Sequence, residues 1–248
     1  MQSVFDSVIS SSNGVFISQK FEATSSSPLS VVLSAFDDLC MLLTSRNSET
    51  EQQHIYEQLA EEFGDSLFLL VRTVPNVVRL APSLSHASSV INEAATESEV
   101  NFFSLCNIIQ RFMRIVSNIS PPVVIFLDDL QWADAVSFGL IHTLLSDTAS
   151  SLFFVGTYRD NEVSPAHIIF GFRHWLSNFN VPLNMIKITG VALDDVNSMV
   201  SDVLGVLPRI CRSLSKMVFL KTKGNPFFVQ TFVRSLGKQN PANHYPVQ

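Results

Sequence analysis

The fold is decided by the stretch Val123-Val124-Ile125-Phe126-Leu127-Asp128-Asp129-Leu130-Gln131-Trp132-Ala133-Asp134, which begins as an apolar run and ends in two adjacent carboxylates. A continuous apolar run of this kind is typical of a parallel strand that is covered on both faces. Ligands of open α/β sheets bind outside the carboxyl ends of the strands, and Mg²⁺ prefers carboxylate oxygens. The stretch therefore predicts a buried strand that carries Asp128 and Asp129 to a site for Mg²⁺ and phosphate.

The composition excludes several classes of protein. The chain has 248 residues, of which 46% are hydrophobic and 15% are charged, so it can bury a large core and is not intrinsically disordered. Each apolar stretch is interrupted before it reaches the roughly 18 residues that a membrane span needs. The net charge of −6 argues against a nucleic-acid partner held by phosphate contacts. We therefore expect a protein without nucleic-acid or membrane partners.

The cysteines and histidines give no sign of a metal centre. Cys40, Cys106 and Cys211 lie far apart, without the spacing of a zinc site or a redox pair. The six histidines likewise lack ligand spacing. Without such spacing, we expect the cysteines to be buried thiols in a reducing compartment. The N-terminal residues lack the pattern of a secretory signal, so we expect a cytoplasmic protein.

The other predicted elements alternate between strands and helices. Short apolar runs predict strands at residues 15–21, 152–157 and 183–189, in addition to the strand at 123–128. Helical periodicity predicts helices over residues 1–12, 31–45, 48–63, 99–119, 135–148 and 165–179. Ser48 and Glu51 have the spacing of a capping box. After Leu193 only helices are predicted, so the sequence indicates an α/β fold with a helical tail.

Three motifs, in this order, resemble the AAA-type ATPase domain of large signalling proteins, of the STAND class related to origin-recognition ATPases. They are Phe126 to Asp134, which matches a Walker B element, Gly156-Thr157-Tyr158-Arg159-Asp160-Asn161-Glu162-Val163, and Lys223-Gly224-Asn225-Pro226-Phe227-Phe228-Val229. A weaker match, Gly14 to Glu22, resembles the segment after the family's P-loop helix. The resemblance implies a P-loop NTPase-like parallel sheet with flanking helices, followed by a small helical lid.

The resemblance also implies roles for the two adjacent carboxylates. Asp128 would hold Mg²⁺, and Asp129 would orient the attacking water, because phosphoryl transfer requires both functions. The structural alternative is an Asp-Asp helix cap after a core strand. Many members with two aspartates hydrolyse ATP slowly, so slow turnover is implied.

Two further sites follow from the same resemblance. Arg159 would contact the γ-phosphate, since a guanidinium can bind two phosphate oxygens at once. The alternative is a surface arginine paired with Asp160 or Glu162. Gly224, Asn225 and Pro226 would bind the nucleotide, with Pro226 against adenine. The alternative is a helix stop followed by a new helix start, and one turn could do both.

The phosphate-binding loop of the family has no counterpart in the sequence. No Gly-x-x-x-x-Gly-Lys-Ser/Thr occurs, and the Gly-Lys pair at Gly237-Lys238 is followed by Gln239. Because that loop supplies backbone N–H groups and a lysine to the phosphates, we expect weak or undetectable ATP binding. In the resembled fold, the strand before this loop lies between the strands that correspond to 123–128 and 152–157. The resemblance therefore implies that these two strands lack their shared partner.

The sequence therefore supports two functional hypotheses. The first is part of an ATP-binding, ATP-hydrolysing signalling ATPase that acts as a nucleotide-dependent switch on other protein domains or subunits, with ATP or ADP and Mg²⁺ as ligands. The second is a pseudo-ATPase that serves as a protein interaction module without catalysis. Whether the chain is an enzyme stays open at this point. The expected domains are an ATPase core at residues 1–190, a helical lid at 191–240 and a tail at 241–248.

Overall fold

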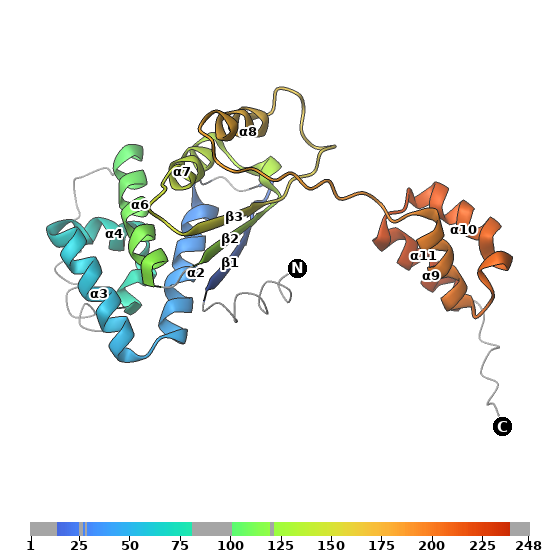
Figure 1. Ribbon diagram of the computed structural model, residues 1–248, viewed down its shortest axis with the longest axis horizontal. Coiled ribbons are helices and arrows are strands. Elements are labelled where there is room, and N and C mark those ends of the chain that lie inside the picture. Colours follow the sequence, from blue (N-terminus) through green and yellow to red (C-terminus); the bar gives the residue numbers. More distant parts are fainter. Residues whose placement is uncertain (1–13, 25–26, 28, 81–100, 120–121, 239–248) are drawn as a thin grey trace. The chain divides into compact units, whose positions relative to one another are not determined.

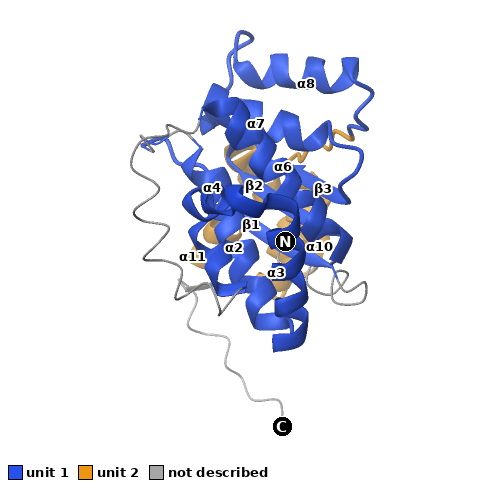
Figure 2. Ribbon diagram, turned by 90° about the vertical axis from the view of Figure 1, so that its left-hand side faces the viewer, with its two compact units in different colours: residues 1–183 blue, residues 184–248 orange. Residues whose placement is uncertain are grey.

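The computed structural model describes residues 14–24, 27, 29–80, 101–119 and 122–238. The chain divides into two compact units, residues 1–183 and 184–248, which Figure 2 distinguishes by colour. The helix predicted at residues 1–12 and the tail predicted at residues 241–248 lie outside the described residues. Each unit has its own hydrophobic core.

The first unit contains a parallel sheet of three strands, β1 (Val15–Lys20), β2 (Val123–Asp128) and β3 (Leu152–Gly156), as Figure 1 shows. Their order in the sheet is β1-β2-β3. In register, Val15 pairs with Val123, and Val123 pairs with Leu152. All three strands therefore end at the same edge of the sheet. This arrangement is consistent with a P-loop NTPase-like fold.

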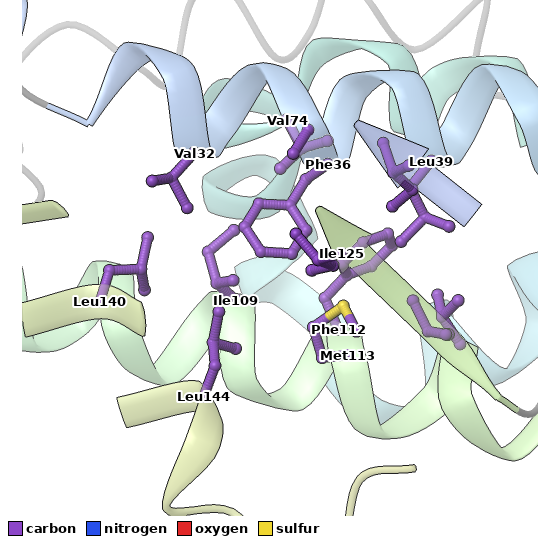
Figure 3. Packing of buried hydrophobic residues seen from close by; sticks show 14 of the residues in the cluster. Val32, Phe36, Leu39, Val74, Ile109, Phe112, Met113, Ile125, Leu140 and Leu144 are labelled. Carbon is purple, nitrogen blue, oxygen red and sulfur yellow. The ribbon is translucent and has the colours of Figure 1, made fainter. Parts of the chain in front are cut away.

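Helices surround this sheet and supply most of the core of the first unit. Their bounds are α2 (Ser30–Arg46), α3 (Glu49–Phe63), α4 (Leu67–Thr73), α6 (Phe102–Ile119), α7 (Ala135–Leu145) and α8 (Ile168–Asn178), with short 3₁₀ turns η1 (Gly64–Ser66), η2 (Pro75–Leu80) and η4 (Leu130–Trp132). Figure 3 shows side chains of α2, α6 and α7 in one hydrophobic cluster with Ile125 of β2. The rings of Phe36 and Phe112 pack edge to face with centroids 6.4 Å apart.

Most predicted elements of the first unit agree with the structure to within a few residues. The capping box at the start of α3 is confirmed, because Ser48 and Glu51 each bond the other's backbone N–H. The helix predicted at 165–179 begins three residues later, since His167 caps α8 from the preceding position. Sequence periodicity thus located these predicted helices and strands, and the capping residues determine where α3 and α8 begin.

The expected gap between two strands is wrong. Strands β2 and β3 are direct neighbours, and Phe126 pairs with Val155 without any strand between them. Within the described residues β3 is hydrogen-bonded to β2 alone, so its second edge is the outer edge of this sheet. Phe153 on β3 is 57% exposed.

The strand predicted at residues 183–189 does not form either. These residues have no regular secondary structure, and Leu183, Met185, Ile186 and Ile188 are exposed. Strands are stabilised by hydrogen bonds to a neighbouring strand, and this segment pairs with none among the described residues. Residues 183–189 therefore have the apolar pattern of a strand, but they form none because no described strand is hydrogen-bonded to them.

The second unit consists of helices α9 (Leu193–Leu204), α10 (Pro208–Thr222) and α11 (Pro226–Lys238). Val196 and Val200 of α9, Val218 of α10, and Val229 and Val233 of α11 form its core. This agrees with the prediction that only helices follow Leu193. In the part of the chain that the structure describes, no helix is both long enough and apolar enough to cross a membrane.

Candidate functional site

The candidate site lies at the sheet edge where the three strands of the first unit end. Lys20 is the last residue of β1 and pairs in register with Asp128, the last residue of β2. Thr157 follows β3, and its backbone N–H donates to Leu127 O at 3.0 Å. The carboxyl ends of parallel strands meet at one edge, which is where α/β proteins bind ligands. Parallel pairing therefore gathers these residues, although they are distant in sequence.

An ammonium group lies beside the two predicted carboxylates. Lys20 Nζ is 3.0 Å from Asp129 Oδ2 and 3.8 Å from Asp128 Oδ2. The pKa of Lys20 is raised, first by its hydrogen bond to Asp129 and then by the charges of Asp129 and Asp128. The lysine side chain is 57% exposed, so solvent weakens these ion pairs.

Asp129 is held in an unusual backbone conformation. Its φ is 56°, in the left-handed region that few residues other than glycine adopt. It stands at the start of η4, but its side chain makes no capping hydrogen bond there. The cap of the following helix is Asp134, whose Oδ1 accepts from Ser137 N at 2.8 Å. The geometry thus does not support a capping role for Asp129.

Several groups keep Asp129 ionised. Burial raises the pKa of this carboxyl, but hydrogen bonds from Lys20 and Gln131 and the charges of Arg159 and Lys20 outweigh it. The pKa therefore lies below its ordinary value. A carboxylate that is held so firmly as an anion is a weak proton acceptor but a strong acceptor of hydrogen bonds.

Asp128 is the more accessible of the two acids. Its side chain is 38% exposed, whereas that of Asp129 is 9% exposed. Thr157 Oγ1 donates a hydrogen bond to Asp128 Oδ1, and the same hydroxyl accepts from Asp129 N at 3.3 Å. Thr157 therefore fixes the orientation of Asp128, whose Oδ2 faces the ammonium of Lys20 at the edge of the sheet.

Arg159 reaches the same cluster from the loop after β3. Its Nε lies 3.3 Å from Asp129 Oδ1, and its Nη1 lies 2.9 Å from Glu162 Oε1. The pKa of Arg159 is raised by the hydrogen bond to Glu162 and the charges of Asp129 and Glu162. The pairing with Glu162 that the structural alternative predicted is thus present, together with a second contact to Asp129.

Gln131 connects these groups. Its amide Nε2 donates to Asp129 Oδ1 at 3.1 Å and to Glu162 Oε2 at 3.0 Å, while its Oε1 accepts from Arg159 N at 3.2 Å. Gln131 is 5% exposed. A buried amide that makes three hydrogen bonds through its oxygen and nitrogen orders its partners strongly. Gln131 therefore ties the end of β2 to the loop after β3.

Helix α8 is joined to this network through His167. Its Nδ1 accepts from Ile169 N at 3.2 Å, so Nε2 carries the proton and donates to Gln131 O at 3.1 Å. The same imidazole thus caps α8 and bonds the backbone of η4. His167 therefore couples helix α8 to the 3₁₀ turn η4 at the site.

The donor set fits a magnesium ion that also takes ligands from elsewhere. Carboxylate and hydroxyl oxygens are the hard ligands that Mg²⁺ prefers, and proteins often supply only one or two carboxylates. Among the described residues, no group of three or more His, Cys, Asp or Glu side chains could hold a metal alone. A magnesium ion at Asp128 would therefore complete its shell with water and phosphate oxygens.

The predicted nucleotide-binding turn lies in the second unit, between α10 and α11. Lys223 and Gly224 both have positive φ, of 52° and 72°, and end α10. Asn225 Oδ1 then accepts from Phe227 N at 3.0 Å, which caps α11. A Cβ on Gly224 would lie 2.3 Å from Val191 O, so only glycine fits. The helix stop and restart are thus confirmed, and the turn packs against the residues before α9.

Comparison with protein families identifies the chain. The model of the AAA ATPase domain matches residues 1–155, which is more than half of the chain and includes Lys20, Asp128 and Asp129. The chain belongs to the AAA ATPase domain family. This membership agrees with the parallel sheet and with acidic residues at the end of its central strand.

A curated relative of this AAA ATPase domain is "Hybrid signal transduction histidine kinase G" from Dictyostelium discoideum, which is 26% identical. The match covers 89% of this chain but only 8% of that protein. No solved structure matches the chain.

Sequence patterns assigned no role to Lys20 or Gln131, although both lie in the motifs quoted above. Lys20 could have been found because it lies one residue before the end of the strand predicted at 15–21, and strand ends share one edge of a parallel sheet. Gln131 could not, since its role depends on where three other side chains point. Asp128, Asp129 and Arg159 are brought together as the motifs suggested.

Proposed function

We propose that this AAA ATPase domain is the nucleotide-responsive part of a signalling ATPase of the STAND class, and that it binds and slowly hydrolyses ATP with Mg²⁺. One observation carries the proposal: two acidic and two cationic side chains meet at the carboxyl ends of parallel strands. An acid can bind the metal there, while cations attract phosphate oxygens. The relative's name, which includes signal transduction, supports the signalling role.

The proposal gives each residue a separate task. Asp128, the more exposed acid, would bind Mg²⁺, which when bound neutralises phosphate charge. Asp129 would accept a hydrogen bond from the attacking water and so orient it, since its lowered pKa favours orientation over proton removal. Arg159 is 55% exposed and would turn toward the γ-phosphate.

The second unit would serve as the lid. Gly224, Asn225 and Pro226 would contact the nucleotide, with Pro226 against adenine, as the family resemblance implies. The nucleotide state would then reposition the lid and act on attached protein domains in the cytoplasm.

A second function is favoured by the lack of a Gly-x-x-x-x-Gly-Lys-Ser/Thr sequence in these 248 residues. In that case the domain is a pseudo-ATPase that retains the fold and binds other proteins. The cation–acid cluster would then be a structural network, and ATP would not be turned over.

Asp129→Asn separates the two functions. At millimolar Mg²⁺ and ATP, the switch hypothesis predicts that the wild type releases phosphate slowly. It predicts that Asp129→Asn releases phosphate more slowly still, by a factor of about ten or more, while its nucleotide affinity stays within about twofold of the wild type. Asp65→Asn, which removes an exposed acid from η1 in the same unit, should leave both quantities unchanged. Equal phosphate release from the wild type and Asp129→Asn would sink the catalytic proposal and favour the pseudo-ATPase.

A further inference from the structure

The ion pairs at the sheet edge point to a role for Lys20 that the family roles above do not include. Among the described ion pairs, Lys20 is the cation that contacts both Asp128 and Asp129. Arg159 pairs with Asp129 and Glu162. The ammonium therefore lies on the side of the two acids where both present their Oδ2 atoms.

The acids are fixed, whereas the lysine can leave. Asp129 is held by Gln131 and Asp128 by Thr157, so neither carboxylate depends on Lys20 for its orientation. Lys20 reaches the acids on a flexible stem, and its side chain is 57% exposed. Removal of the ammonium from the acids would thus leave the core intact.

The charge balance favours entry of a cation. The linked side chains are two cations, Lys20 and Arg159, against three carboxylates, Asp128, Asp129 and Glu162, so one negative charge is in excess. A polyphosphate would be repelled by this cluster as it stands. A divalent cation in place of the ammonium would cancel this excess charge, but it would compete with the ammonium for the same oxygen atoms.

We propose that Lys20 is an internal counter-ion of the acid pair, and that a divalent cation must displace it in order to bind Asp128. This inference rests on the proposed function in one respect, the assignment of Asp128 as the metal ligand. It adds that pairing of Lys20 with the acids and binding of the metal exclude each other. Lys20 then sets the metal affinity of the nucleotide-free domain.

The competing explanation is that Lys20 only joins β1 to β2. The backbone ladder already pairs these strands along their length, and Phe21 N donates to Asp128 O at 3.0 Å beyond Lys20. A structural tie predicts that loss of the ammonium weakens the fold and does not strengthen metal binding.

Titration with Mn²⁺ in the absence of nucleotide, followed by electron paramagnetic resonance, tests the proposal. A unit charge about 4 Å from a divalent ion changes its binding constant by roughly thirtyfold in pure water, and salt reduces this effect. We expect Lys20→Met to bind Mn²⁺ about tenfold more tightly than the wild type. Lys20→Arg keeps the charge and should bind within about twofold of the wild type.

The double variant Lys20→Met/Asp128→Asn locates the metal. It should lose the gain in affinity, because the proposed ligand is gone. Affinity of Lys20→Met equal to or weaker than wild type would overturn the proposal, as would a gain that persists in the double variant. Thermal melting of each variant confirms that it is folded. Phosphate release is a separate readout, so a domain without ATPase activity can still pass or fail this test.

Discussion

Lys20 Nζ and Asp129 Oδ2 lie 3.0 Å apart, although one residue ends β1 and the other follows β2. Because β1 and β2 are parallel neighbours, the contact requires only that both strands end at the same edge. Arg159 approaches the other oxygen of Asp129 from the loop after β3. A single buried carboxylate thus joins the ends of all three strands.

The contacts of Asp129 predict how the free energy of unfolding depends on pH. The pKa of Asp129 is lower in the folded state than the value of about 3.9 in an unfolded chain. Its contribution to the free energy of unfolding is present above pH 4 and is lost as the pH falls through the folded value. Urea unfolding between pH 6 and pH 3 should therefore show a shallower acid decline in Asp129→Asn than in the wild type. An unchanged decline would contradict this prediction, and Asp65→Asn provides the control.

Gln131→Leu should destabilise the first unit by about 1–3 kcal/mol, because it removes the three hydrogen bonds of a buried amide, with Asp129, Glu162 and the backbone N–H of Arg159. Gln53→Leu is the matched control, since the exposed Gln53 bonds only Glu57 among the contacts described and its loss should cost less than about 0.5 kcal/mol. Urea unfolding measures both. Equal losses in the two variants would show that the network around Gln131 adds nothing to stability.

His167→Ala should cost about 1 kcal/mol, because it removes both the cap of α8 and the bond to Gln131 O. Hydrogen exchange should then increase at the start of α8 and at η4 together, since one side chain joins them. His174→Ala alters an exposed position of the same helix and should change neither region. Faster exchange confined to α8 would argue against the coupling.

Gly14→Ala should destabilise the fold by about 1–3 kcal/mol, because a Cβ at this position would lie 2.7 Å from the backbone oxygen of Pro122. Gly171→Ala is the opposite case. Nothing lies within 4 Å of its added Cβ, so alanine should stabilise α8 by about 0.5–1 kcal/mol. Thermal melting distinguishes the two signs. A neutral Gly14→Ala would mean that β1 can shift away from Pro122.

The sequence predicted the sheet of the first unit well, for a physical reason. The strands at Val15, Val123 and Leu152 are apolar runs bounded by polar residues, and this local signal survives in the structure. The run at 183–189 carries the same signal but forms no strand. This run forms no strand because it has no neighbouring strand to pair with among the described residues. Periodicity indicates which face of a segment is apolar, but it does not indicate which sheet edge the segment can join.

The candidate site was predictable only in part. Asp128, Asp129 and Arg159 stand at strand ends, and parallel pairing brings such ends together. Lys20 and Gln131 act through side-chain directions and register, which no local pattern specifies. The local sequence pattern also did not specify the order of the strands. The structure corrects the expected order, because β2 pairs directly with β3.

The central claim is that the acids at the sheet edge bind a magnesium nucleotide. Calorimetric titration of ATP into the wild type and Asp128→Asn, each with Mg²⁺ and with a chelator, tests it most directly. We predict binding weaker than roughly micromolar that requires Mg²⁺ and is lost in Asp128→Asn, because one or two carboxylates hold Mg²⁺ only weakly. Binding that is indifferent both to Mg²⁺ and to Asp128→Asn would contradict the account.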